Sequence, residues 1–150
     1  AVIEAALQGI PAIALSQFMG PANRDLADPF EAAAAHGAAT VRALLDRGIW
    51  TQTDAYTTFY NVNFAPLPAA SVKGLKVTTQ GRRPDVNFSV QADRSPTGRD
   101  FLWVRGGPQH GATAPGTDAQ ANLDGYTSVT PMRADLTAHD MVSKLKGLLE

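Results

Sequence analysis

The segment 10–16, with the sequence Ile-Pro-Ala-Ile-Ala-Leu-Ser, constrains the fold more than any other part of the chain. It is short and mostly apolar, so a strand built from it needs both of its faces covered. Such strands are typical of the middle of a parallel sheet. An Ala-rich helical segment that ends at Gly9 precedes it, and a second helical pattern follows it. The order of helix, strand and helix predicts an α/β fold with a doubly wound, Rossmann-like sheet.

The helix that follows this strand has the clearest boundaries in the sequence. Asp28 is the expected N-cap, Pro29 takes the first helical position, and Glu31 completes a capping box with Asp28. Apolar residues then recur near helical spacing, and Gly48 provides the stop. We therefore expect a long amphipathic helix that ends at Gly48.

Beyond this helix the apolar period changes to two, which is typical of strands. Tyr60, Val62 and Phe64 fall on one face of the first such segment, and Pro66 and Pro68 close it. Further strands are expected over residues 72–80, 86–91, 101–105 and 126–131, with a turn at 95–98.

Two elements of the second half are expected to leave the body of the domain. One is a long hairpin over residues 82–105, and the other is a C-terminal helix over residues 137–150 with a capping box of Thr137 and Asp140. A shorter helix, capped by Thr117 or Asp118 and ending at Gly125, lies between them. The C-terminal helix carries one apolar stripe, made by Met141, Leu145 and Leu148. Both projecting elements would expose apolar faces unless a partner covers them. The chain therefore resembles the second half of a doubly wound sheet, incomplete alone.

Composition narrows the class of protein without identifying it. The chain has 150 residues, 44% of them hydrophobic and 18% charged, and its mean hydropathy of -0.14 is that of an ordinary globular domain. No apolar stretch reaches the roughly 20 residues of a membrane-spanning helix. The absence of cysteine excludes disulfides, thiolate metal sites and a cysteine nucleophile, and it fits a reducing compartment, so we expect a cytoplasmic protein.

Charge is unevenly distributed, although the net charge is only -1. Residues 72–105 hold seven Lys and Arg against three Asp, and the remainder is acidic. A local basic excess attracts phosphate groups or nucleic acid, but it also solubilises a hairpin edge. The segment has too few interleaved aromatic residues to bind single strands by stacking, so a nucleic acid partner is not expected.

The three histidines are far apart in sequence, and the chain lacks the usual phosphate-loop, nucleophile-elbow and zinc-peptidase motifs. His36 is expected to be a partly buried structural residue of the long helix. His110 lies in a Gly/Pro-rich loop without a nearby carboxylate in the sequence. His139 follows Asp135 by four residues at the start of the last helix, so the two side chains can pair and hold the angle at which this helix leaves the body.

Few polar residues point to a ligand. Ser16 ends the first strand, where doubly wound folds place ligands, although an ordinary strand-ending serine explains it equally well. Asn61 and Asn63 project from one face of a strand and are explained by solvent on that side. The Asp residues show no spacing typical of a complete divalent-metal site.

Several segments together resemble one family, the SurE survival-protein nucleotidases. The matching stretches are Glu4 to Ser16, Asn-Val-Asn at 61–63, Val-Thr-Thr-Gln-Gly-Arg-Arg at 77–83, Gly-Thr-Asp at 116–118, Gly-Tyr-Thr-Ser-Val-Thr-Pro at 125–131 and Asp-Leu-Thr-Ala-His-Asp at 135–140. They stand in the order of the family and span nearly the whole chain, which makes them specific when taken jointly.

The resemblance implies a metal-dependent 5'-nucleotidase that hydrolyses nucleoside monophosphates, using a divalent ion, Mg or Mn, and its bound water. The Asp-Asp-Gly motif and the Ser/Asn loops of the family, which hold the metal, are expected upstream of Ala1. The chain is thus expected to be the C-terminal portion of a single SurE-like domain, inactive by itself, with no catalytic or metal residue of its own. The alternative is a non-catalytic oligomerisation or binding module.

The resemblance also implies an architecture. In the family the hairpin, here 82–105, and the C-terminal helix, here 137–150, exchange between subunits to form dimers and tetramers. Asp135 and His139 would then lie at the hinge of the exchanged helix. Ser16, Arg82 and Arg83 are the candidates for positions near the substrate.

Overall fold

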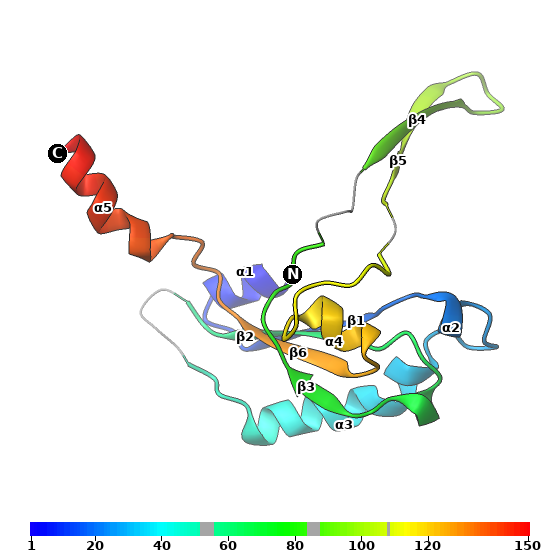
Figure 1. Ribbon diagram of the computed structural model, residues 1–150, viewed down its shortest axis with the longest axis horizontal. Coiled ribbons are helices and arrows are strands. Elements are labelled where there is room, and N and C mark those ends of the chain that lie inside the picture. Colours follow the sequence, from blue (N-terminus) through cyan, green and yellow to red (C-terminus); the bar gives the residue numbers. More distant parts are fainter. Residues whose placement is uncertain (52–55, 84–87, 108) are drawn as a thin grey trace.

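The computed structural model describes residues 1–51, 56–83, 88–107 and 109–150. Its body is built on a four-stranded sheet with the strand order β1-β2-β6-β3 (Figure 1). β2 pairs with β1 in parallel and with β6 in antiparallel orientation, while β3 pairs in parallel with β6. The strands are β1 (Ala12–Gln17), β2 (Phe59–Phe64), β3 (Leu75–Val77) and β6 (Thr127–Met132). This mixed α/β sheet confirms the predicted fold class.

Helices cover the sheet unequally. The long helix α3 lies along one face, and the short helix α4 lies across the other (Figure 1). α3 ends at Gly48 as predicted, and Thr117 caps α4 by accepting a hydrogen bond from the Gln120 amide. The helices of the body are α1 (Val2–Leu7), α2 (Pro21–Arg24), α3 (Glu31–Arg47), the 3₁₀ turn η1 (Ala69–Ser71) and α4 (Asp118–Leu123).

The hydrophobic core lies between α3 and the even-numbered residues of β2. Tyr60, Val62 and Phe64 are at most 5% exposed and pack with Leu44 and Val129. The predicted period of two in this strand is therefore confirmed, because alternate side chains point to opposite faces of a sheet. The Tyr60 hydroxyl also accepts a hydrogen bond from the Ile49 amide at 2.7 Å and donates to the Ile49 carbonyl at 2.9 Å, which ties the end of α3 to the sheet.

β1 departs from its predicted place in the sheet. It is parallel, as expected, but it lies at an edge, and among the described residues it is hydrogen-bonded to β2 alone. Leu15, on this edge strand, is 48% exposed. The prediction of a central strand was therefore wrong for this chain.

The predicted capping box of α3 is also not formed. The helix begins at Glu31 with Phe30 as its N-cap, so the predicted N-cap Asp28 and first helical residue Pro29 were wrong. The Asp28 carboxylate accepts a hydrogen bond from the Phe30 amide at 2.9 Å in the turn that precedes the helix. The Glu31 carboxylate instead accepts from the Ala69 amide at 3.1 Å, and His36 bonds the Ala69 carbonyl at 3.0 Å. Both side chains thus fasten η1 to α3, which confirms the structural role expected of His36.

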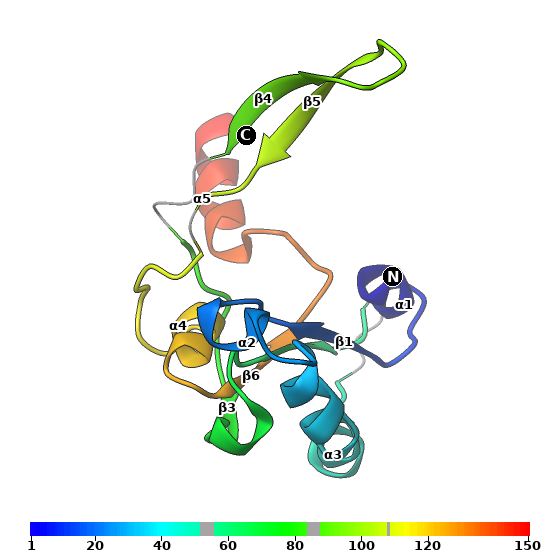
Figure 2. The ribbon, with the colours of Figure 1, turned by 90° about the vertical axis from the view of Figure 1, so that its right-hand side faces the viewer.

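A hairpin and the C-terminal helix project from the same side of the body (Figures 1 and 2). The hairpin pairs β4 (Ser89–Arg94) with β5 (Asp100–Arg105), and its turn is closed by a hydrogen bond from the Gly98 amide to the Ser95 carbonyl. The first strand of the hairpin was predicted to begin at Val86, which lies outside the described residues. The helix α5 (His139–Leu149) has no buried residue. Its N-cap is Ala138 and the Thr137 side chain does not cap it, so the predicted capping box of Thr137 and Asp140 was wrong. Among the described residues, no helix is long and apolar enough to cross a membrane.

Candidate functional site

A polar cleft of about 460 Å³ opens beside the carboxyl ends of β1 and β2. Side chains of these two strands form its floor, and α4 and the loop that returns from the hairpin form its walls. It is lined by Ser16, Gln17, Phe18, Met19, Asn61, Asn63, Gly81, Arg83, Gln109, Asp118, Ala119 and Asn122. Ligand sites of open α/β sheets occur at this kind of position.

The floor of the cleft consists of uncharged polar groups. Ser16 and Asn63 are register partners in the parallel pair β1/β2, and Asn61 lies two residues before Asn63 on the same face. Asn122, from α4, supports the floor by donating one hydrogen bond to the Asn63 carbonyl at 2.8 Å and another to the Tyr126 carbonyl at 3.0 Å. The strand pairing therefore holds three short polar side chains in one row beside solvent.

The wall on the α4 side depends on Gly81 and Asp118. The Asp118 carboxylate accepts hydrogen bonds from the Gly81 amide at 2.8 Å and from the Ala119 amide at 2.7 Å. The Asp118 amide donates to the Thr79 carbonyl at 2.9 Å. These bonds fix the chain that follows β3 against the first turn of α4, and both bonds to the Asp118 carboxylate fall on its Oδ1 atom.

The opposite wall carries a positive charge. The Arg83 guanidinium lies 5.2 Å from the centre of the Phe18 ring and donates a hydrogen bond to the Gln109 carbonyl. The His110 ring stacks on the same Phe18 ring at 5.3 Å between centres. Cation–π contact and one backbone acceptor thus hold Arg83 at the cleft without an acidic partner among the described residues.

The predicted substrate-proximal residues separate into two groups. Ser16 and Arg83 both line the cleft, although they are 67 positions apart in the sequence. Arg82 is exposed and does not line it. The roles of all three stay predictions, but only Ser16 and Arg83 are brought together.

Asn61 and Asn63 are residues that sequence reasoning missed. Their alternation with the core residues of β2 is visible in the sequence, and solvent on that side of the strand is enough to explain it. The signal that could have identified them is the register: Ser16 was already a ligand candidate, and a parallel partner strand places its own polar residues beside it. Phe18 gave no such signal, because its contact with Arg83 joins loops distant in sequence.

The cleft does not by itself fit a divalent metal ion. Mg and Mn favour several oxygen ligands that include carboxylates. In the part of the chain that the structure describes, no group of three or more His, Asp or Glu side chains could hold a metal ion. Asp118 is the one carboxylate among the described residues that line the cleft, and its Oδ1 atom accepts two backbone hydrogen bonds.

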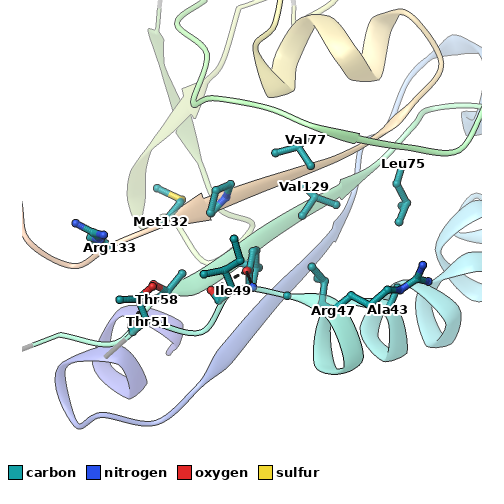
Figure 3. Close-up of a pocket in the computed structure, with 14 residues that line it drawn as sticks. Ala43, Arg47, Ile49, Thr51, Thr58, Leu75, Val77, Val129, Met132 and Arg133 are labelled. Atoms are coloured by element: carbon teal, nitrogen blue, oxygen red, sulfur yellow. Dashed lines mark hydrogen bonds between the residues drawn. The ribbon is translucent and has the colours of Figure 1, made fainter. Parts of the chain in front are cut away.

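A second, apolar groove of about 630 Å³ lies on the face of the sheet that carries α3 (Figure 3). α3 covers β1 and β2 but not the whole of β6 and β3, so Leu75 and Val77 of β3 remain 50% and 77% exposed along its side. Its charged lining groups are Arg47 and Arg133. This groove lacks the convergent polar groups of the cleft, and we assign the chemistry to the cleft.

Asp135 and His139 are in contact, as the sequence predicted. The His139 Nε2 atom lies 2.5 Å from a carboxylate oxygen of Asp135, and the other carboxylate oxygen accepts a hydrogen bond from the Thr137 amide at 2.9 Å. Hydrogen bonds from the His139 ring and from Thr137 hold the pKa of Asp135 well below its usual range. The pair joins the segment that follows β6 to the first residue of α5, where the chain leaves the body.

Comparisons with known proteins agree on one family. The family model of the survival protein SurE matches residues 1–87. The 5'-nucleotidase SurE of Cereibacter sphaeroides strain ATCC 17025 is 61% identical over 147 residues, and that of Roseobacter denitrificans is 55% identical over 146 residues. These alignments cover 98% and 97% of this chain and 56% of each relative, so the chain spans about half the length of the curated relatives it matches.

A solved structure gives the same result for the fold. The crystal structure of the SurE protein from Aquifex aeolicus superposes with a TM-score of 0.67 at 34% identity and covers 99% of this chain and 55% of that one. Sequence and fold thus agree over nearly all of this chain. The chain belongs to the SurE family.

Proposed function

We propose that this chain is the C-terminal portion of a 5'-nucleotidase that hydrolyses nucleoside monophosphates. The observation that carries the proposal is the 61% identity over 98% of the chain to a protein named 5'-nucleotidase SurE. The cleft is compatible with such a substrate, because it joins the cation Arg83 to a row of neutral hydrogen-bonding groups. A phosphate ester of a sugar needs both kinds of partner.

The proposal includes a divalent metal ion, Mg or Mn. We assign the ion mainly to residues outside this chain, and the support is that the chain spans only about half the length of its curated relatives. Among the described residues, no group of three or more His, Asp or Glu side chains could hold a metal ion. The part played by this chain is then to supply one side of the substrate cleft. We also propose a cytoplasmic location, which the absence of cysteine supports.

The test is an assay of two proteins. The full-length protein that contains this chain is expected to release phosphate from AMP or GMP in the presence of Mg or Mn, and the 150-residue chain alone is expected to give no turnover. Turnover by the short chain would show that the metal site has been misplaced. An inactive full-length protein would favour the alternative, a non-catalytic oligomerisation or binding module.

Arg83 is expected to contribute to substrate binding, whereas Arg82 is not. Replacing Arg83 with Ala in the full-length protein removes a positively charged hydrogen-bond donor, so the KM for AMP should rise roughly tenfold. Arg82→Ala is the matched control, because the same charge is removed from a side chain that does not line the cleft, and its KM should stay within about twofold. The KM for AMP of both variants is also measured at two salt concentrations. If salt changes the two KM values equally, the contribution of Arg83 is only a general effect of charge.

We further propose that copies of this chain assemble into dimers or tetramers through the hairpin and α5. The register of the hairpin places Val90, Ala92, Leu102 and Val104 on one face, and none of these side chains is buried. On α5, Met141, Leu145 and Leu148 are between 53% and 80% exposed. Apolar faces of this kind are commonly covered by a partner, and exchange of both elements between subunits would cover them.

The Asp135–His139 pair is expected to influence this assembly. Asp135→Asn removes the negative charge that faces His139, so the dissociation constant of the oligomer should rise roughly two- to fivefold at neutral pH. Because the folded-state pKa of Asp135 is lowered, the contact should persist above the usual Asp pKa of about 3.9 and be lost only as the pH falls below it. Sedimentation across this pH range measures both effects.

The control for this prediction is Asp140→Asn. Asp140 is an exposed carboxylate on the first turn of α5, so the substitution makes the same change of charge outside the pair. Equal weakening by Asp135→Asn and Asp140→Asn would argue for a general charge effect and against a hinge.

A further inference from the structure

Residue chemistry alternates along β2, and the two faces of the sheet differ in consequence. The even-numbered residues Tyr60, Val62 and Phe64 form the core under α3, whereas Asn61 and Asn63 face the cleft. Sheets with helices on both faces ordinarily present apolar residues to both sides. Packing therefore does not explain why this face of β2 is polar at both positions.

The amides of the floor are also free of partners in the protein. Within the described residues, neither the Asn61 nor the Asn63 side chain has a hydrogen-bond partner, and the Ser16 hydroxyl has none either. Asn122 and Gln17, which line the same cleft, are used structurally: the Asn122 amide bonds two carbonyls, and Gln17 donates to the Ala65 carbonyl at 2.9 Å and accepts from the Ala33 amide at 3.1 Å. The cleft thus contains both committed amides and available ones.

The chemistry of the available groups favours hydroxyls as their ligands. A side-chain amide offers a donor and an acceptor, and a hydroxyl offers the same pair. A phosphate dianion offers acceptors only, so it is matched better by the guanidinium of Arg83 on the wall of the cleft. Positions two apart on a strand are separated by about 6.7 Å, a span that two adjacent hydroxyls bridge with hydrogen bonds of about 2.9 Å at each end.

We propose that Asn61 and Asn63 bind the ribose hydroxyls of the nucleotide whose phosphate Arg83 attracts. The inference rests on the proposed nucleotidase function and adds a specificity determinant to it. Asn61 and Asn63 then contribute to the binding of ribonucleotides and not to the binding of phosphate esters that lack a sugar diol. Ser16 stands beside Asn63 in the register and completes the neutral row.

The experiment measures kcat/KM of the full-length protein for three phosphate monoesters: AMP, 2',3'-dideoxy-AMP and phenyl phosphate. The variants are Asn61→Leu and Asn63→Leu, which keep a similar volume and remove the hydrogen-bonding groups. For AMP, each variant is expected to lower kcat/KM roughly five- to twentyfold. For the two substrates without ribose hydroxyls, kcat/KM should stay within about twofold of the unsubstituted protein.

Gln8→Leu, at the residue that follows α1, is the matched control, because it removes an exposed side-chain amide outside the cleft and should change none of the three values. If circular dichroism shows that a leucine variant is not folded, the same three substrates are measured with Asn61→Ala and Asn63→Ala instead. An equal loss for AMP and phenyl phosphate, or no loss for AMP, would overturn the inference. An unsubstituted protein that hydrolyses none of the three esters would overturn the proposed function, and the inference with it.

Discussion

Replacing Phe64 with alanine is expected to lower the free energy of unfolding by about 3–5 kcal/mol. Phe64 is 1% exposed and ends β2 within the core cluster. Its ring faces Gly37 of α3, where even a built Cβ would lie only 3.8 Å from the tip of the ring. Removing the ring leaves a cavity between β2 and α3, and its cost is a large part of the roughly 5–15 kcal/mol by which a typical domain is stable.

Urea unfolding of the full-length protein, followed by circular dichroism, measures this change. Phe30→Ala is the matched control, since the Phe30 side chain is 57% exposed and its removal should alter the unfolding free energy by less than about 1 kcal/mol. A Phe64→Ala protein as stable as the Phe30→Ala protein would show that α3 does not depend on this contact.

Replacing Gly81 with alanine is expected to damage the cleft through a clash, with a cost of about 1–3 kcal/mol. A Cβ at this position would lie 2.9 Å from both the Asp118 carboxylate and the Thr117 Cβ, and 3.1 Å from the Ala119 Cβ. Two of these atoms are fixed to the backbone of α4 and have no rotamer by which to move. The chain after β3 must therefore separate from α4, which breaks the hydrogen bond between the Gly81 amide and Asp118.

The expected result is a loss of stability together with a fall in activity, because Arg83 follows Gly81 by two residues and must move with it. Thermal unfolding and AMP turnover of the full-length protein measure the two effects. Gly106→Ala serves for comparison: a Cβ at Gly106 meets nothing within 4 Å, so this variant should retain both properties. Unchanged stability in Gly81→Ala would mean that α4 adjusts freely.

The sequence predicted those parts of the fold that depend on local pattern. The period of two in β2, the turn at 95–98 and the Thr117 cap are all present, because each is determined by a few neighbouring residues. The capping box of Asp28 and Glu31 was predicted wrongly because the Glu31 carboxylate can accept either from a backbone amide at the start of its own helix or from a distant one. Glu31 bonds Ala69, which is 38 residues away, and no local pattern reveals that contact.

The site shows the same division. Ser16 was found from its position at the end of a strand, and the contact of Asp135 with His139 follows from a spacing of four residues. The cleft itself depends on long-range placement: Arg83 reaches Phe18, and Gly81 reaches Asp118, only after the sheet has formed. A partly exposed asparagine also gives no sequence signal that separates a ligand contact from ordinary solvation.

The alternation along β2 has a consequence for how this protein tolerates change. Asn61 and Asn63 can be exchanged one at a time without altering the side chains that pack under α3, so the lining of the cleft and the packing of the core vary independently in this strand. A single inserted or deleted residue has the opposite effect, because a shift of one position turns every side chain to the other face. It would place amides in the core and aromatic rings in the cleft, so the length of this strand is more tightly constrained than the identity of its polar residues.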